Sequence, residues 1–203
     1  MQDIAGCRVI VNDVLEQDKF VAELKLDFPE STVIDRRESS SHGYRAVHVT
    51  VKMRGKLIEI QVRSALQHLW AEFSEKSSDV YDPAIKHGSG DPQLRHSLAM
   101  TSEEIADFEK FEKIHNENLR LGKKTESSFK EKKRVVKKMR RGHRPNPEFE
   151  KYQKELKLFA RKKKHLAWKD NELGQASQRV RKAITDTLTK AIADLDQRRE
   201  QKK

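Results

Sequence analysis

The sequence predicts an α/β domain that is followed by a basic all-helical extension, and three observations support this. Short β-branched segments, such as residues 7–12 and 44–63, occur only in the first half of the chain. Beyond residue 92, the apolar residues recur at helical spacing. Residues 1–115 carry 15 Lys and Arg against 20 Asp and Glu, whereas residues 116–203 carry 28 against 12. We therefore expect an acidic domain over 1–115 and a basic helical extension over 116–203.

The first elements follow from local patterns. Residues 7–12 form a short β-branched strand after a glycine, and residues 18–26 place apolar side chains at helical spacing. Pro29 ends that helix, and residues 31–35 are consistent with a second strand. The serine- and glycine-rich residues 39–43 then predict a loop.

The clearest pattern is a β-hairpin. Residues 44–53 and 56–63 alternate between polar and apolar side chains and are separated by the two-residue turn Arg54-Gly55. If Met53 faces Lys56, cross-strand partners share a face, because side chains alternate along each strand. One face then carries Tyr44, His48, Thr50, Glu59, Gln61 and Arg63. The other carries Val47, Val49, Val51, Ile58, Ile60 and Val62. We expect the apolar face to pack on a core and the polar face to hold a site.

The remainder of the chain predicts helices. Ser64 is a suitable N-cap for a helix over 65–75, and residues 79–92 read as a loop with two prolines and two glycines. Thr101 or Ser102 is expected to begin the next helix. Breaks are expected at Gly122 and at residues 141–147, followed by two further helices marked by Phe149, Tyr152, Leu156 and Phe159, and by Val180, Ile184, Leu188, Ala191 and Leu195.

The composition excludes several protein classes. Hydrophobic residues make up 35% of the 203 residues, and the longest apolar runs span three or four residues, so no membrane span is expected. The start of the chain lacks the apolar segment of a secretory signal. The single cysteine, Cys7, excludes a disulfide framework and a multi-cysteine zinc site. A reducing, cytoplasmic setting fits these features best.

Two carboxylates are candidates for chemistry, and each has two interpretations. Asp3 precedes a strand, and Glu59 lies in the middle of a strand between two isoleucines. Glu59 is either a salt-bridged edge residue or, together with Asp3, part of a Mg²⁺ site, because Mg²⁺ prefers one or two carboxylates plus substrate phosphates. Tyr44 is similarly either an ordinary sheet aromatic or a platform for a base.

Four ordered motifs resemble the synthetase domain of RelA/SpoT proteins. They are DIAGCRVI at residues 3–10, GYRAVH at 43–48, EIQVR at 59–63 and HLWAE at 68–72. The resemblance implies a nucleotidyltransferase-like mixed β-sheet flanked by helices. It also implies transfer of pyrophosphate from ATP to a 3′-hydroxyl, usually that of GDP or GTP, which makes (p)ppGpp.

The resemblance also implies roles for individual residues. Asp3 and Glu59 match the Mg²⁺-binding carboxylates, and Glu59 is also expected to help to activate the acceptor hydroxyl. Tyr44 matches the tyrosine that stacks on the acceptor base, and His48 matches a histidine near the acceptor phosphates. Positions expected to contact phosphates or to support the site are Arg8, Gln61 and Arg63.

The sequence departs from the family pattern in two places. The basic ATP-binding residues of the family precede the strand that Asp3 introduces, and this chain begins two residues before Asp3, so we expect little product from the chain alone. The family motif Lys-x-Asn-Gly-Tyr is here Ser40-Ser41-His42-Gly43-Tyr44. Residues 44–48 (YRAVH) with Ser74-Glu75, and residues 85–91 (IKHGSGD), are similar to the toxic small alarmone synthetases, some of which pyrophosphorylate the CCA 3′ end of tRNA. The similarity suggests an antitoxin partner or a homo-oligomer.

The basic extension has two interpretations. Lysine- and arginine-rich runs, such as residues 130–141 and 161–164, would bind the phosphates of RNA, in particular of a tRNA substrate. They would alternatively form only a solvated face of charged helices. The alternative to a pyrophosphotransferase is therefore a degenerate, non-catalytic remnant that acts as an RNA-binding or regulatory module.

Overall fold

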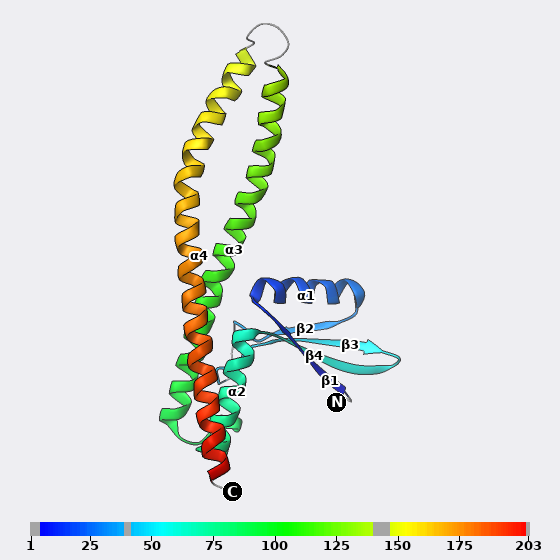
Figure 1. Cartoon of the computed structure of the whole chain (residues 1–203). Coiled ribbons are helices and arrows are strands. Elements are labelled where there is room, and N and C mark those ends of the chain that lie inside the picture. The colour runs from blue at the N-terminus through cyan, green and yellow to red at the C-terminus, as the bar shows by residue number, and fades with distance from the viewer. Residues whose placement is uncertain (1–4, 39–41, 140–146, 202–203) are drawn as a thin grey trace. The chain divides into compact units, whose positions relative to one another are not determined.

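The structure is a computed structural model that describes residues 5–38, 42–139 and 147–201 (Figure 1). The chain divides into two compact units, one made of residues 1–113 and 181–203 and the other of residues 114–180. Residues 181–203 thus belong to the same unit as the sheet. The functional division into residues 1–115 and 116–203 stays a prediction.

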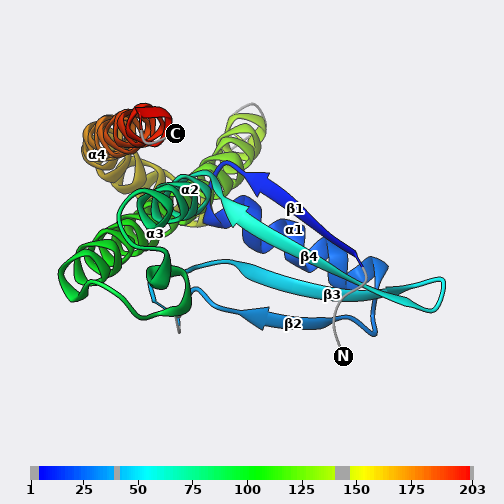
Figure 2. The same ribbon diagram turned by 90° about the horizontal axis from the view of Figure 1, so that it is seen from below.

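A four-stranded mixed sheet is the centre of the first unit. Its strands are β1 (Ala5–Val11), β2 (Thr32–Asp35), β3 (Val47–Met53) and β4 (Lys56–Ser64). They lie in the order β1-β4-β3-β2, with β1 parallel to β4 and the other neighbours antiparallel (Figure 2). The predicted α/β fold with a mixed sheet flanked by helices is confirmed.

The predicted hairpin register is confirmed. His48 pairs with Gln61, Thr50 pairs with Glu59, and Met53 pairs with Lys56. The valines of β3 are fully buried and pack against residues of helix α1 (Val14–Asp27). The apolar face of the sheet therefore lies under α1, and the polar face is left for the site.

Helix α1 begins four residues earlier than the pattern from residue 18 predicts. Asp13 has an extended backbone, and its side chain accepts a hydrogen bond from the Glu16 amide at 2.9 Å. A carboxylate at this position satisfies an amide that the first helical turn leaves without a partner. The N-cap, and not the apolar spacing, sets the start of this helix.

Helix α2 (Ala65–Val80) begins where the sequence predicts. Ser64 accepts a hydrogen bond from the Gln67 amide, and the Gln67 side chain accepts one from the Ser64 amide, which is a complete capping box. The helix extends beyond the predicted end at residue 75, and a short 3₁₀ helix, η1 (Pro83–His87), lies within the predicted loop. This loop connects α2 to the next helix.

The helices of the first unit share a second core. Its buried members come from α2, η1, the first part of α3 (Pro92–Met139) and the last part of α4 (Pro147–Gln201). They are Leu66, Trp70, Ile85, Leu98, Ile105 and Leu188. This core holds the loop after α2 against the end of the sheet that carries Tyr44.

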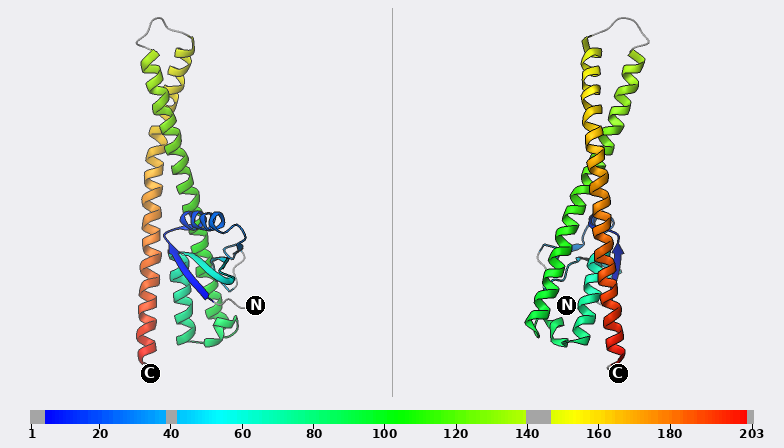
Figure 3. Two further views of the ribbon diagram at one scale, coloured as in Figure 1. Left: turned by 90° about the vertical axis from the view of Figure 1, so that its right-hand side faces the viewer. Right: turned by 60° about the vertical axis from the view of Figure 1, so that its left-hand side comes forward.

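The two long helices differ from the prediction. Helix α3 begins at Pro92 and continues through Thr101 and Gly122 to Met139, and α4 is one helix where two were expected (Figure 3). A proline suits the first position of a helix, and one internal glycine costs only about 1 kcal/mol among strong helix formers. The predicted break at 141–147 lies largely outside the described residues. No described helix is apolar enough along its length to cross a membrane.

A buried polar network joins the sheet to the helices. The Glu109 carboxylate, which is 4% exposed, accepts hydrogen bonds from the Ser64 hydroxyl and, at 2.9 Å, from the Gln67 amide. Gln17 of α1 donates to the Val62 carbonyl at 2.7 Å and to the Gln67 side chain at 3.0 Å. Burial raises the pKa of Glu109 above its usual value, although the two hydrogen bonds oppose this shift.

We predict that Glu109 makes the stability of the fold depend on pH. Because its pKa is raised in the folded state, the folded chain holds a proton that the unfolded chain has lost, and stability falls as the pH rises above the usual Glu value. In Glu109→Gln this loss should disappear, since the amide can still pair with Ser64 and Gln67. Glu109→Ala removes the acceptor of the Ser64 hydroxyl and of the Gln67 side-chain amide, and it should lower the free energy of unfolding by about 1–3 kcal/mol.

Urea unfolding of the three proteins at several pH values tests this prediction. If the free energy of unfolding of the wild type and of Glu109→Gln changed with pH in the same way, the prediction for Glu109 would be wrong.

Candidate functional site

The polar face of the β3–β4 hairpin carries a chain of hydrogen bonds. Arg63 donates from Nη2 to the Tyr44 hydroxyl at 3.1 Å, and that hydroxyl lies 3.0 Å from Nε2 of His48. Nδ1 of His48 lies 2.5 Å from a Glu59 oxygen. With the proton on Nδ1, each group donates to the next, from Arg63 through Tyr44 and His48 to Glu59. This tautomer is assigned from the network.

Glu59 ends this chain as an ionised carboxylate. The hydrogen bond from His48 lowers the pKa of Glu59 below its usual value, with a smaller contribution from Gln61 and an attraction to Arg36, while burial opposes the shift. Its second oxygen has only a long contact, 3.4 Å, to the Gln61 amide. Glu59 therefore offers a charged oxygen that is available to a metal ion or to a proton donor.

Tyr44 is held by the loop that precedes β3. Gly43 has φ +86°, and a Cβ at this position would lie 2.7 Å from the Trp70 ring, so only glycine fits. The Gly43 carbonyl accepts a hydrogen bond from the Ser102 hydroxyl at 2.5 Å. The Arg63 guanidinium lies 4.9 Å from the Tyr44 ring centroid, which is a cation–π distance. These contacts fix the orientation of the Tyr44 ring.

A cavity of about 370 Å³ lies beside Tyr44 and is strongly cationic. It is formed by the sheet, by α2, by the loop that contains η1 and by the start of α3. Glu75 is the one acidic side chain among its lining residues. The basic side chains that line it are Arg8, Arg36, Arg63, Lys86 and Arg95, together with His42. Such a cavity suits a ligand with several negative charges.

Two arginines of this cavity have donors without a partner. Arg63 is 5% exposed, and its Nε atom is buried with no hydrogen-bond partner among the described residues. The Nε atom of Arg95 is in the same situation, although another nitrogen of that side chain donates to the Gly88 carbonyl at 2.8 Å. Buried donors that stay unpaired are costly, and both side chains line the cavity, so their positive charge lies beside the space that an anionic ligand would occupy.

The predicted site residues fall into three groups. One hydrogen-bonded network contains five of them, since Arg63 also donates to Gln61 at 3.3 Å: Tyr44, His48, Glu59, Gln61 and Arg63. Arg8, Tyr44 and Arg63 line the cavity, whereas His48, Glu59 and Gln61 do not. Asp3 and Ser40 lie outside the described residues.

Sequence reasoning did not single out three basic residues of the cavity. Arg36 directly follows β2, and its amide continues the pairing with β3 by donating to the Ala46 carbonyl at 2.9 Å. Lys86 lies in η1, within the segment 85–91 that resembles the toxic small alarmone synthetases, and Arg95 lies in the first turns of α3, beyond the motifs. The end of a strand was a usable signal for Arg36, but only the packing of the loop after α2 brings Lys86 and Arg95 to the cavity.

The described residues allow only a partial metal site. Among them, no three His, Cys, Asp or Glu side chains lie close enough to hold a metal ion together. Glu59 alone supplies one carboxylate with an oxygen that lacks a short hydrogen bond. That donor set fits Mg²⁺ that is bound largely by substrate phosphates, for which one or two protein carboxylates suffice.

Comparison with known proteins supports the resemblance of the motifs. Residues 1–84 match the family described as "Region found in RelA / SpoT proteins". The uncharacterized protein Rv1366 of Mycobacterium tuberculosis is 37% identical over 97 residues, and so is Mb1401 of Mycobacterium bovis. Each match covers 46% of this chain and 36% of the relative, so the chain corresponds to little more than a third of these relatives.

Solved structures with some similarity include two bacterial proteins. Small alarmone synthetase 1 from Bacillus subtilis is 22% identical with a TM-score of 0.45, and the similarity covers 59% of this chain and 65% of that one. A GTP pyrophosphokinase family protein from Streptococcus pneumoniae is 23% identical with a TM-score of 0.43, over 60% of this chain and 63% of that one. The chain thus spans less than two thirds of each.

We predict that the cavity binds inorganic pyrophosphate and that Arg95 contributes to the affinity. A charge-assisted hydrogen bond contributes about 1.5–3 kcal/mol, so Arg95→Gln should weaken binding roughly tenfold or more. Lys52→Gln is the matched control, because Lys52 is exposed on β3 and does not line the cavity. Isothermal titration calorimetry measures the affinity of both variants for pyrophosphate. Equal affinities of the two variants would show that Arg95 does not contribute to binding.

Proposed function

Because residues 1–84 carry the region found in RelA/SpoT proteins, we propose that this chain is part of an enzyme that transfers pyrophosphate from ATP to a 3′-hydroxyl. The observation that carries the proposal is the cationic cavity beside Tyr44, which the buried Arg63 and the half-buried Arg95 line, each with an unpaired Nε donor. A triphosphate brings several negative charges to such a cavity. The aromatic ring at its wall is suited to stack on a base.

The proposed acceptor is a guanosine nucleotide, which gives (p)ppGpp, or the CCA end of a tRNA. Tyr44 stacks on the acceptor base in either case, because stacking on an aromatic ring does not depend on base-specific hydrogen bonds. Four residues contact the phosphates or hold the side chains that contact them: Arg8, His48, Gln61 and Arg63. Arg36, Lys86 and Arg95 add to the positive charge that the phosphates meet.

In the proposed reaction, the acceptor 3′-oxygen attacks the β-phosphorus of ATP. The bond from that oxygen to phosphorus forms, the bond between the β-phosphorus and the α,β-bridging oxygen breaks, and AMP leaves. Glu59, which its hydrogen bond with His48 keeps ionised, accepts the hydroxyl proton. Such transfers depend on positioning and positive charge more than on covalent catalysis.

Mg²⁺ is the proposed cofactor, with Glu59 and Asp3 as the residues that would hold it. When bound, it would neutralise charge on the transferred phosphates. The arginines of the cavity supply further positive charge from the protein itself.

A second candidate function is a non-catalytic module that binds RNA or regulates a partner. The excess of Lys and Arg in residues 116–203, 28 against 12 Asp and Glu, favours it. An antitoxin or a second copy of the chain is a possible protein partner under either function, and a cytoplasmic location suits both.

In a form of the protein that makes product, we predict that Glu59→Gln abolishes product formation while leaving the fold intact. Glutamine can still accept the hydrogen bond from His48, but it binds Mg²⁺ poorly and cannot accept a proton, and the loss of a general base costs about 10²–10⁴ in rate. The assay measures the transfer of label from ATP to GDP, GTP or tRNA in the presence of Mg²⁺. Glu23→Gln, an exposed residue of α1, is the control.

Equal rates for Glu59→Gln and the control would show that Glu59 is only a sheet residue. If a form of the protein that includes the ATP-binding residues of the family makes no product with any acceptor and does not bind ATP, the non-catalytic function replaces the proposed one.

A further inference from the structure

Residues 114–180 form a unit with an unusual charge. They carry 21 Lys and Arg against 8 Asp and Glu, a net charge of +13. The first unit, with 22 Lys and Arg against 24 Asp and Glu, is close to neutral. The charge of the chain is therefore concentrated in the two-helix segment of α3 and α4.

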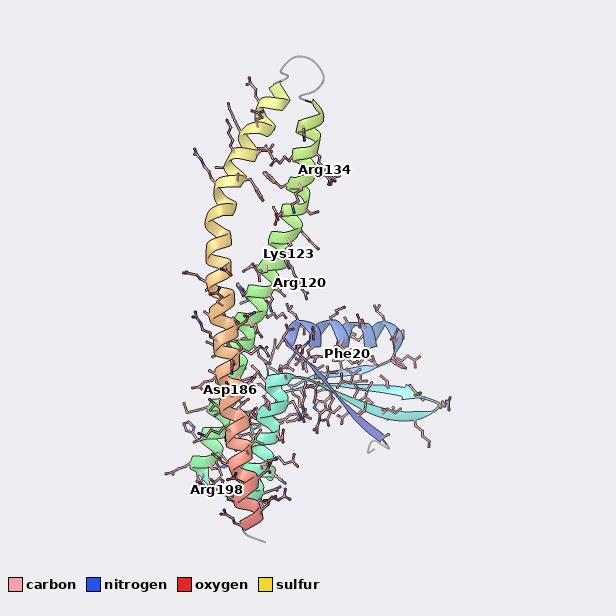
Figure 4. The ribbon with its side chains drawn as sticks, viewed as in Figure 1. Phe20, Arg120, Lys123, Arg134, Asp186 and Arg198 are labelled. Carbon is pink, nitrogen blue, oxygen red and sulfur yellow. The ribbon has the colours of Figure 1, made fainter. Side chains whose placement is uncertain are left out.

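Part of this charge forms one surface, which we call the basic ridge. It consists of seven Lys and Arg side chains of α3, all of which are exposed (Figure 4). Over a helix rise of 1.5 Å per residue, the ridge is about 25 Å long. Its members are Arg120, Lys123, Lys124, Lys130, Lys133, Arg134 and Lys137.

The ridge lies on one side of α3. At about 100° per residue, its seven members fall within roughly half of the helix circumference. Phe129 lies on the opposite side, where its ring stacks on Phe159 of α4 with centroids 4.2 Å apart. On α4, a second basic group also lies opposite Phe159: Lys154, Lys157 and Arg161. Both helices thus turn aromatic rings towards each other and cations away from each other.

The chemistry of the ridge limits what it can bind. Between residues 120 and 137, the described side chains on the half of α3 that carries the ridge are all polar or charged, so they offer nothing to insert into a bilayer. Two acids, Glu126 and Glu131, lie on the same half, and Lys130 is 3.5 Å from Glu126. Seven cations against two acids leave a net +5 on the ridge.

We propose that the basic ridge binds the phosphate backbone of a nucleic acid. Duplex nucleic acid carries about one negative charge per 1.7 Å of its axis, so a straight ridge of about 25 Å meets phosphates along its whole length. A single nucleotide or a small anion would engage only two or three of the seven cations. The ridge binds independently of the proposed reaction and reads no base sequence.

The test compares two full-length quadruple variants. One removes four charges of the ridge, through Lys123→Gln, Lys130→Gln, Arg134→Gln and Lys137→Gln. The other removes four exposed helical charges of the first unit, through Lys110→Gln, Lys182→Gln, Lys190→Gln and Arg198→Gln. The two variants have the same net charge, and glutamine has nearly the same helix propensity as lysine and arginine. Circular dichroism verifies that both are folded.

Fluorescence anisotropy then measures binding to a short RNA duplex, to a DNA duplex of the same sequence and to single-stranded RNA at several salt concentrations. Each lost phosphate contact flattens the log–log salt dependence by about 0.7–0.9, so the ridge variant should lose roughly 3 in slope and at least about tenfold in affinity. The control variant should retain the salt dependence and the affinity of the wild type. Binding to RNA, to DNA or to both supports the proposal and shows which nucleic acid supplies the phosphate backbone.

Three results would overturn the proposal: no binding of the wild type at low salt, equal losses in both variants, or tighter binding to vesicles of anionic lipid than to any nucleic acid. Turnover with GDP as acceptor separates this proposal from the catalytic one. The ridge variant should retain any turnover of the wild type, because no ridge residue lines the cavity or belongs to the Glu59 network.

Discussion

The register between β3 and β4 is the constraint on which the site depends. Because His48 pairs with Gln61 and Thr50 with Glu59, the polar side chains of both strands lie on one face. A slip of one residue would turn the polar side chains of one strand towards the core and its apolar side chains towards the site. The valines of β3, which are fully buried, oppose such a slip. Burial on one face therefore fixes the geometry of the site on the other.

Four arginines of the first unit differ in their partners. Arg37 forms ion pairs with Asp18 and Asp35, at 2.7 and 2.5 Å, and Arg181 donates to Glu112 at 2.8 Å. These arginines stabilise the fold, since each has an acidic partner. Arg63 and Arg95, in contrast, have buried Nε donors without a partner among the described residues, and both line the cavity. Their charge is thus available to the anionic ligand that we propose for the cavity.

The two units are stabilised in different ways. The first has two hydrophobic cores and a buried polar network around Glu109. In the second, the stacking of Phe129 on Phe159 is the aromatic contact that joins the helices within the described residues, while its Lys and Arg repel one another. Neutralisation of these charges by a polyanion would remove that repulsion. Binding and stability are thus expected to be coupled in this unit.

The sequence by itself determined the local features whose causes are local. Alternation and the Arg54-Gly55 turn specified the hairpin and its register, and Ser64 specified the start of α2. The four motifs resemble the synthetase domain of RelA/SpoT proteins, in line with the match of residues 1–84, and they contain the residues of the hydrogen-bonded network. Helix lengths were less predictable, because a single Gly122 is a weak break that strong helix formers on both sides outweigh.

Only the tertiary structure decided which distant residues meet. Lys86 and Arg95 reach the cavity because the apolar residues Ile85 and Leu98 pack with Trp70 in one core, and no local pattern encodes that contact. The return of residues 181–203 to the first unit has the same origin, since Leu188 is buried in that core. Hydrophobic burial between elements far apart in the chain depends on the whole fold, whereas strand alternation and helix caps depend on neighbouring residues alone.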